Sequence, residues 1–211
     1  MLTLYQSNRL DYLVELLARL FSEAPADPFC PETLVVQHQG MARWLSLQLA
    51  ERLGICANFE FPLPAAFVWQ MFRLLLEETP EANRFEPSVM QWQIHQLLGE
   101  LEGQAGFEPI RSYLDASDER GRFDLAQRIA RCFDQYLVYR PDWIARWESG
   151  QEACAGDRWQ AMLWRRLRAA LGAGHWVDMQ RRLFHAAEAG ELRTDLLPQR
   201  IALFGMPALS P

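Results

Sequence analysis

The sequence contains no lysine, and all 21 of its basic residues are arginine. Three kinds of chemistry need a lysine side chain: the phosphate-binding loop of nucleotide hydrolases, Schiff-base catalysis, and general-base catalysis by an amine. None of them is available to this chain. The missing lysine therefore argues against a nucleotide-hydrolysing enzyme before any fold is considered.

Long apolar runs are also absent. No stretch of eighteen apolar residues occurs, and the N-terminus lacks a basic segment followed by an apolar one. A membrane span or signal peptide is therefore not expected, and the protein is predicted to be cytoplasmic. The four cysteines form no CxxC pair, which favours reduced structural thiols over zinc or disulfides. They are Cys30, Cys56, Cys132 and Cys154.

Motifs of catalysis are missing too. The sequence has no GxSxG elbow, no HExxH and no compact acidic motif of a two-metal nuclease. The four histidines, at positions 38, 95, 175 and 185, do not have metal-ligand spacing. The residues thus predict a chain without catalytic residues, metal or cofactor.

The net charge is −6 and the pI is about 5.3. This acidic balance argues against a free-standing nucleic-acid binder. It leaves open a basic groove on one face, or a channel completed by partner chains. Half of the residues are hydrophobic, so burying a substantial core is no difficulty.

Residues 1–75 and 191–211 have the pattern of an α/β unit. Strand, helix, strand and helix in succession predict a parallel sheet with crossover helices. The predicted strands are Leu2–Tyr5, Thr33–Val36, Asn58–Phe61 and Arg200–Phe204. The predicted helices begin near Leu10, Gly40 and Ala65, and Gly54 closes the second of them. The chain stops where a loop would lead into another helix, which predicts a part of a longer protein.

Residues 76–190 show helical periodicity almost without strand signal, which predicts an all-helical insertion subdomain. The predicted helices are Ser88–Glu102, Phe107–Leu114, Glu119–Val138, Pro141–Trp147, Arg158–Leu171 and Met179–Ala189.

The stretch Thr33–Phe72 concentrates unusual polar residues at the end of a strand. Gln37, His38 and Gln39 precede a helix that presents Arg43 one turn in. Glutamine can read base edges and arginine can pair with phosphate or guanine, but such residues are also routine in solvated loops. Farther along, Arg165, Arg166, Arg168, Arg181 and Arg182 form either a phosphate track or solvated helix faces.

Five motifs, which together extend from one end of the chain to the other, resemble the RecC family, the gamma subunits of exodeoxyribonuclease V. They are LYQSNRLDYL, VVQHQGMARWL, GICANFEFPLPAAFVWQMF, FDQYLVYRPDW and LFGMPALSP. The resemblance implies a P-loop-helicase-like (superfamily-1) domain that has lost ATP hydrolysis, with a helical insertion. It also implies a subunit that works with RecB-like and RecD-like partners on duplex-end DNA, binds the 3′-ended single strand and scans it for a Chi-like sequence.

The resemblance further implies a set of DNA-binding residues. Gln37, Leu63, Trp69, Asp134 and Arg140 match the Chi-recognition positions of the family. Gln39 and Arg43 fall on such positions but replace a smaller hydroxyl residue and a glutamine. Arg131 and Cys132 replace an acidic and an aliphatic residue. The arginines shift this surface toward phosphate contact, which is less sequence-specific.

Two other functions compete with DNA recognition. A purely structural protein–protein adaptor would leave the arginine clusters as solvated faces. An active P-loop NTPase is opposed by the missing lysine, and by the missing glycines in the turn Gln6–Arg9.

Overall fold

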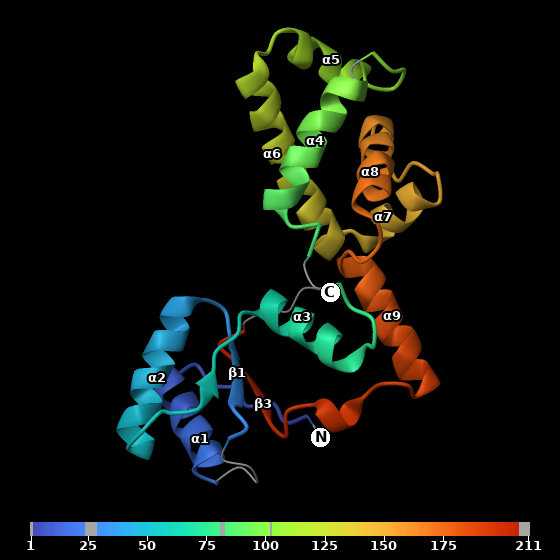
Figure 1. Ribbon diagram of the computed structural model, residues 1–211. Coiled ribbons are helices and arrows are strands. Elements are labelled where there is room, and N and C mark those ends of the chain that lie inside the picture. Colours follow the sequence, from blue (N-terminus) through green and yellow to red (C-terminus); the bar gives the residue numbers. More distant parts are fainter. Residues whose placement is uncertain (1, 24–28, 81–82, 102, 207–211) are drawn as a thin grey trace. The chain divides into compact units, whose positions relative to one another are not determined.

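The computed structural model of the protein describes residues 2–23, 29–80, 83–101 and 103–206 (Figure 1). The chain divides into two compact units. Unit 1 contains the described residues of Met1–Glu77 and Arg193–Leu209. Unit 2 contains those of Glu78–Leu192.

Unit 1 is built on a small parallel sheet of three strands. They are β1 (Glu32–Val36), β2 (Phe59–Glu60) and β3 (Ile201–Phe204), in the order β2-β1-β3. β1 pairs in parallel with both neighbours, and Thr33 lies opposite Ile201 and Val36 opposite Phe204. Every residue of β1 is buried, as expected of a central parallel strand covered on both faces. The predicted parallel sheet is confirmed in this small form.

Helices α1 (Leu10–Ser22) and α2 (Gln39–Leu53) pack against each other and share a core with alternate residues of β1. Burying each large apolar side chain contributes about 1.5 to 3 kcal/mol. Gly54 ends α2 in the left-handed conformation with a φ of 81°, as the sequence predicts. The buried members of this core are Val14, Leu17, Ala18, Phe21, Leu34, Val36, Ala42, Leu45, Leu49 and Phe204. Unit 1 also contains α3 (Pro64–Leu75) and the short 3-10 helix η1 (Thr194–Leu196).

Arg200, the residue directly before β3, contacts two other segments of unit 1 through its side chain. Its guanidinium pairs with the buried Glu32 at the start of β1. It also donates to the carbonyl oxygens of Leu20 and Glu23 at the end of α1, and lies 4.8 Å from the ring centre of Phe21. One side chain thus links α1, β1 and β3.

The predicted strand Leu2–Tyr5 is wrong. These residues are in no strand, and the side chains of Leu2 and Leu4 are 92% and 86% exposed. A strand needs a hydrogen-bonded neighbour for its N–H and C=O groups, and these residues pair with none of the three strands of the sheet. Helix α1 begins at Leu10, as the sequence predicts, and Ser7 Oγ accepts from the backbone N of Arg9 at 3.1 Å just before it.

Unit 2 contains six helices among its described residues and no strand there. They are α4 (Pro87–Leu101), α5 (Glu108–Asp115), α6 (Glu119–Tyr139), α7 (Pro141–Glu148), α8 (Arg158–Leu171) and α9 (Trp176–Ala189). All six helices predicted in residues 76–190 are present. The predicted start of α9 at Met179 is three residues late, because His175 caps this helix through Nδ1, which accepts from Asp178 N at 3.3 Å. Histidine is not among the residues that usually signal a helix start.

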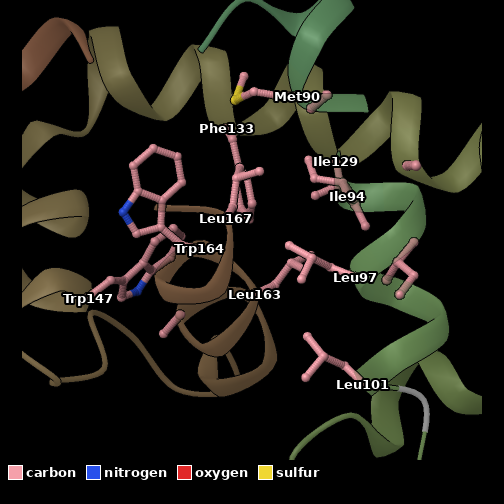
Figure 2. Packing of buried hydrophobic residues seen from close by; sticks show 14 of the residues in the cluster. Met90, Ile94, Leu97, Leu101, Ile129, Phe133, Trp147, Leu163, Trp164 and Leu167 are labelled. Atoms are coloured by element: carbon pink, nitrogen blue, oxygen red, sulfur yellow. The ribbon is translucent and has the colours of Figure 1, made fainter. Parts of the chain in front are cut away.

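The core of unit 2 lies between α4, α6 and α8. Figure 2 shows Ile94, Leu97 and Leu101 of α4 facing Leu163 and Leu167 of α8, with α6 alongside. The rings of Phe133 and Trp164 meet edge to face with centres 5.3 Å apart. Trp147 is fully buried, and its Nε1 donates to Asp157 Oδ2 at 2.8 Å, so the indole brings a satisfied polar group into the core.

A charged network joins α7, α8 and α9 at the edge of this core. Arg168 donates to Asp178 Oδ2 at 2.7 Å and lies 3.3 Å from Glu148 Oε1. His175, which is fully buried, places Nε2 2.7 Å from the same Glu148 oxygen. Burial raises the pKa of Glu148, but the hydrogen bond of His175 and the charges of His175 and Arg168 outweigh it, so this pKa lies below its usual value.

None of the helices in the described ranges is long and apolar enough to cross a membrane.

The lowered pKa of Glu148 predicts a stability loss in acid. A carboxylate whose pKa is lower in the folded state stabilises the fold above its unfolded pKa, and that contribution disappears as the pH falls through the folded pKa. Glu148→Gln should reduce the free energy of unfolding at pH 7 by about 1 to 3 kcal/mol, because a mostly buried ion network loses one of its two carboxylates. Urea unfolding at pH 7 and at pH 3 measures both effects.

The matched control is Glu152→Gln, an exposed carboxylate in the loop between α7 and α8. It should leave the unfolding curve unchanged at both pH values. If Glu148→Gln behaves like Glu152→Gln, the network does not stabilise unit 2.

Candidate nucleic-acid interface

The polar residues after β1 lie where the chain leaves the sheet. His38 is the N-cap of α2, and its Nδ1 accepts from Met41 N at 3.1 Å. Gln37 and Gln39 flank it and are exposed, and in the part of the chain that the structure describes their amides have no hydrogen-bond partner. His38 therefore builds the helix start, while the two glutamines keep their donors and acceptors available.

Arg43 continues this exposed surface along α2. It follows Gln39 by four residues, so the two side chains lie on the same helical face. Its guanidinium has no acidic or carbonyl partner within the described ranges. A free guanidinium one turn from an amide can contact a phosphate or the edge of a guanine.

Leu63 lies beside the end of β1. The backbone N of Val36, the residue before Gln37, donates to Pro62 O at 3.1 Å, which holds the Pro62–Pro64 segment next to the strand end. Leu63 then caps α3 with an extended backbone, and Pro64 occupies the first helical turn, where its missing N–H costs nothing. The side chain of Leu63 is half-buried against the core of unit 1, so only part of it is open to a ligand.

Trp69 lies in the middle of α3. Its ring is half-buried and meets the buried ring of Phe72 edge to face, with centres 5.6 Å apart. At about 1.5 Å per residue, Trp69 lies roughly 9 Å along the helix from Leu63. The indole is thus partly packed within unit 1 and partly exposed.

Asp134 and Arg140 belong to unit 2. Asp134 is half-buried on α6, and its pKa is raised by burial and by the charge of Glu86. Arg140 stands at the corner between α6 and α7, where its backbone N donates to Tyr136 O and its carbonyl accepts from Trp143 N. Its guanidinium donates two hydrogen bonds, of 3.1 and 3.0 Å, to the carboxylate of Asp142 and lies 3.9 Å from the ring centre of Trp143. Arg140 is therefore held in one orientation rather than free.

The seven predicted residues thus fall into two groups. Gln37, Gln39, Arg43, Leu63 and Trp69 belong to unit 1, on the end of β1, the start of α2 and the first half of α3. Asp134 and Arg140 belong to unit 2. Arg131 and Cys132, which also depart from the family pattern, are exposed on α6.

Sequence reasoning missed the network around His175. Glu148, His175 and Asp178 place three possible metal-ligand atoms within 4.8 Å of one another. Arg168 already supplies the positive charge between the two carboxylates, so the arrangement fits a structural ion network. A histidine three residues before an aspartate at the start of a helix is the signal that could have located two of its members. The same geometry corrects the interpretation of Arg168 as part of a phosphate track or a solvated face.

Comparison with known proteins gives a consistent result along the chain. The family model described as "RecC, N-terminal domain" matches residues 2–211. The "RecBCD enzyme subunit RecC" of Escherichia coli (strain K12) is 41% identical over 221 aligned residues, which cover 100% of this chain and 20% of that protein. The protein of the same name from Haemophilus influenzae is 35% identical, with 99% of this chain and 21% of the relative covered.

More distant relatives carry the same name. The protein from Mycolicibacterium smegmatis is 29% identical over 97% of this chain. The chain spans about a fifth of the length of the curated relatives that it matches.

The surroundings of Arg140 predict that its side chain is dispensable for folding. The ion pair with Asp142 is exposed, with 43% and 61% of the two side chains open to solvent, and such pairs contribute little. The backbone groups of residue 140, which cap the two helices, survive its replacement. Arg140→Ala should therefore leave the thermal unfolding midpoint unchanged within error.

Arg168→Ala is the contrasting variant. It removes the guanidinium from the mostly buried network and should lower the midpoint by about 5 °C or more. Equal midpoints for the two variants would contradict this ranking of the arginines.

Proposed function

Because the chain belongs to the RecC family, we propose that it forms the N-terminal part of a non-catalytic DNA-recognition and scaffolding subunit of a helicase–nuclease for double-strand break repair. The shared name of its relatives, RecBCD enzyme subunit RecC, supports this assignment. RecB-like and RecD-like partners would then supply the motor and the nuclease. The 3′-ended single strand, scanned for a Chi-like sequence, is the proposed ligand.

We further propose that unit 1 is a helicase-like domain that no longer hydrolyses ATP. Its parallel sheet with flanking helices is compatible with such a domain, and the absence of lysine removes the residue that a phosphate loop requires. The division of the chain at 1–75, 76–190 and 191–211, with the middle segment as an insertion, is part of this proposal. The return of β3 to the side of β1 after a long helical segment supports it.

The observation that carries the DNA-binding proposal is the unpartnered polar surface at the end of β1. Gln37, Gln39 and Arg43 are exposed together, beside the partly exposed Leu63 at the start of α3. Amides and guanidinium groups bind base edges and phosphates, and an indole such as Trp69 provides a stacking face. A rigid strand end and two helix starts hold these groups in place, as recognition requires.

The net charge of −6 restricts how this surface works. Counterion release by many phosphate contacts drives non-specific binding, and a chain whose net charge is negative supplies little of it. The proposed contacts therefore contribute sequence discrimination, while the remainder of the assembly supplies most of the affinity.

A purely structural adaptor is the second candidate. The exposed rings of Trp92 on α4 and Phe184 on α9 favour it, because large exposed aromatic side chains often anchor protein partners. The two functions are separable, since Trp92 and Phe184 lie outside the predicted DNA-binding set. An active NTPase has no supporting observation.

Variants of Gln37 and Trp69 test the proposal. In the full-length subunit assembled with its partners, Gln37→Ala and Trp69→Ala should each weaken the Chi-dependent change in DNA degradation, while unwinding continues at its normal rate. Stacking of one base contributes about 1 to 3 kcal/mol, so Trp69→Ala should reduce the Chi response about fivefold or more. Counting Chi-terminated fragments on gels measures this response.

Trp92→Ala is the matched control, because it removes an indole that is 63% exposed in unit 2. It should leave the Chi response intact. The site assignment is wrong if both Gln37→Ala and Trp69→Ala retain a full response. Loss of assembly only in Trp92→Ala or Phe184→Ala would favour the adaptor.

A further inference from the structure

A second group of basic residues lies in unit 2, and none of its members belongs to the predicted DNA-binding set. A pocket of about 210 Å³ lies between the end of α4 and α8. It is lined by Leu101, Gln104, Met162, Arg165 and Arg166. Two of its five lining residues are therefore arginines, in a protein whose net charge is −6.

The two arginines of this pocket, Arg165 and Arg166, lie on one face of α8 together with Arg158, which is outside the pocket. Arg158, Met162, Arg165 and Arg166 stand at intervals of four, three and one residues, which places them on the side that faces the loop after α4. Gly106 in that loop confirms the approach, because a Cβ there would come within 2.9 Å of Met162 Sδ and 3.4 Å of Arg158 Nε. From Arg158 to Arg166 the row spans about 10 to 12 Å.

The hydrogen-bonding capacity of these arginines is mostly unused. Arg165 donates one Nη1 bond to Trp147 O at 3.1 Å, which anchors it, while Arg166 has no partner in the part of unit 2 that the structure describes. The carboxylate of Glu108 interacts electrostatically with Arg158 and Arg111, but it also accepts two bonds from Gly106 N. The remaining guanidinium N–H groups at the pocket suit an anion with several acceptor oxygens.

The geometry points to a phosphate-binding pocket that takes the backbone of a nucleic-acid strand. Arg158 lies outside the pocket but on the same face of α8, about 10 to 12 Å along the helix from Arg166, and this length suits successive phosphates of a strand better than a single free anion. The partly exposed side chain of Met162 and the amide of Gln104 suit a sugar or base beside the arginines. This inference rests on the proposed nucleic-acid role and adds a contact to it that reads no sequence.

Reversing one charge of the pocket tests the inference. Binding of fluorescently labelled (dT)10 to the 211-residue chain is followed by anisotropy at several salt concentrations. Arg166→Glu should weaken binding about fivefold or more, and should reduce the slope of log K against log salt by about 0.7 for each phosphate that is no longer neutralised. Arg166 is exposed, so the fold should tolerate the change, and circular dichroism verifies it.

Arg182→Glu on α9 is the matched control, since this arginine is also exposed and changes the net charge equally. It should bind (dT)10 like the unmodified chain. Equal weakening by both variants, or no binding by the unmodified chain, overturns the inference.

Inorganic phosphate distinguishes the two sources of the ligand. Sodium phosphate should displace (dT)10 from the unmodified chain more strongly than sodium chloride of the same ionic strength, but not from Arg166→Glu. Phosphate binding without DNA binding would assign the pocket to a free anion and reject the strand.

The same assay separates this inference from the proposed function. Weakening by Trp69→Ala but not by Arg166→Glu rejects the pocket and leaves the recognition surface of unit 1 standing. Weakening by Arg166→Glu but not by Trp69→Ala supports the pocket and counts against that surface.

Discussion

The pairing of β1 with β3 is the constraint on which unit 1 depends. The two strands are joined residue by residue from Thr33–Ile201 to Val36–Phe204, although all of unit 2 lies between them in the sequence. Closing so long a connection costs entropy that grows only slowly with its length, so a compact insertion is tolerated. Arg200 adds a directed contact, because it ties β3 to Glu32 and to the end of α1. The end of β1, where Gln37 stands, is fixed by the same pairing.

Local chemistry explains why most helices could be predicted from the sequence. Pro64, Pro87 and Pro141 stand in first turns, and Gly54 closes α2, so these ends are set by φ preferences within a few residues. The strand predicted at Leu2–Tyr5 failed for the opposite reason. Apolar character favours a strand, but only a neighbour with free N–H and C=O groups makes one, and that information is not local.

In the candidate site, too, the features set by local sequence could be predicted and those set by contacts between elements could not. The position of Gln37 and Gln39 at a strand end followed from the sequence, because a buried β-branched run stops there. The fixed orientation of the Arg140 side chain could not be predicted in this way. Its hydrogen bond to Asp142 and its stacking on Trp143 depend on the conformation of the turn between α6 and α7. The charged network of Glu148, Arg168 and His175 was equally hidden, because its members come from three helices. Spacing in sequence reveals contacts within an element, and contacts between elements need the fold.

Three arginines make contacts within the fold that lysines could not replace. Arg140, Arg168 and Arg200 each use two or more guanidinium nitrogens on different acceptors or rings. A lysine ammonium is a compact charge without a planar fork, so it could not reproduce the bidentate bond to Asp142 together with stacking on Trp143. Arginines with such partners use their hydrogen-bond donors within the fold. Arginines without such partners, among them Arg43 and Arg166, keep their donors available for a ligand. Any affinity of this acidic chain for a phosphate backbone must therefore come from that second group.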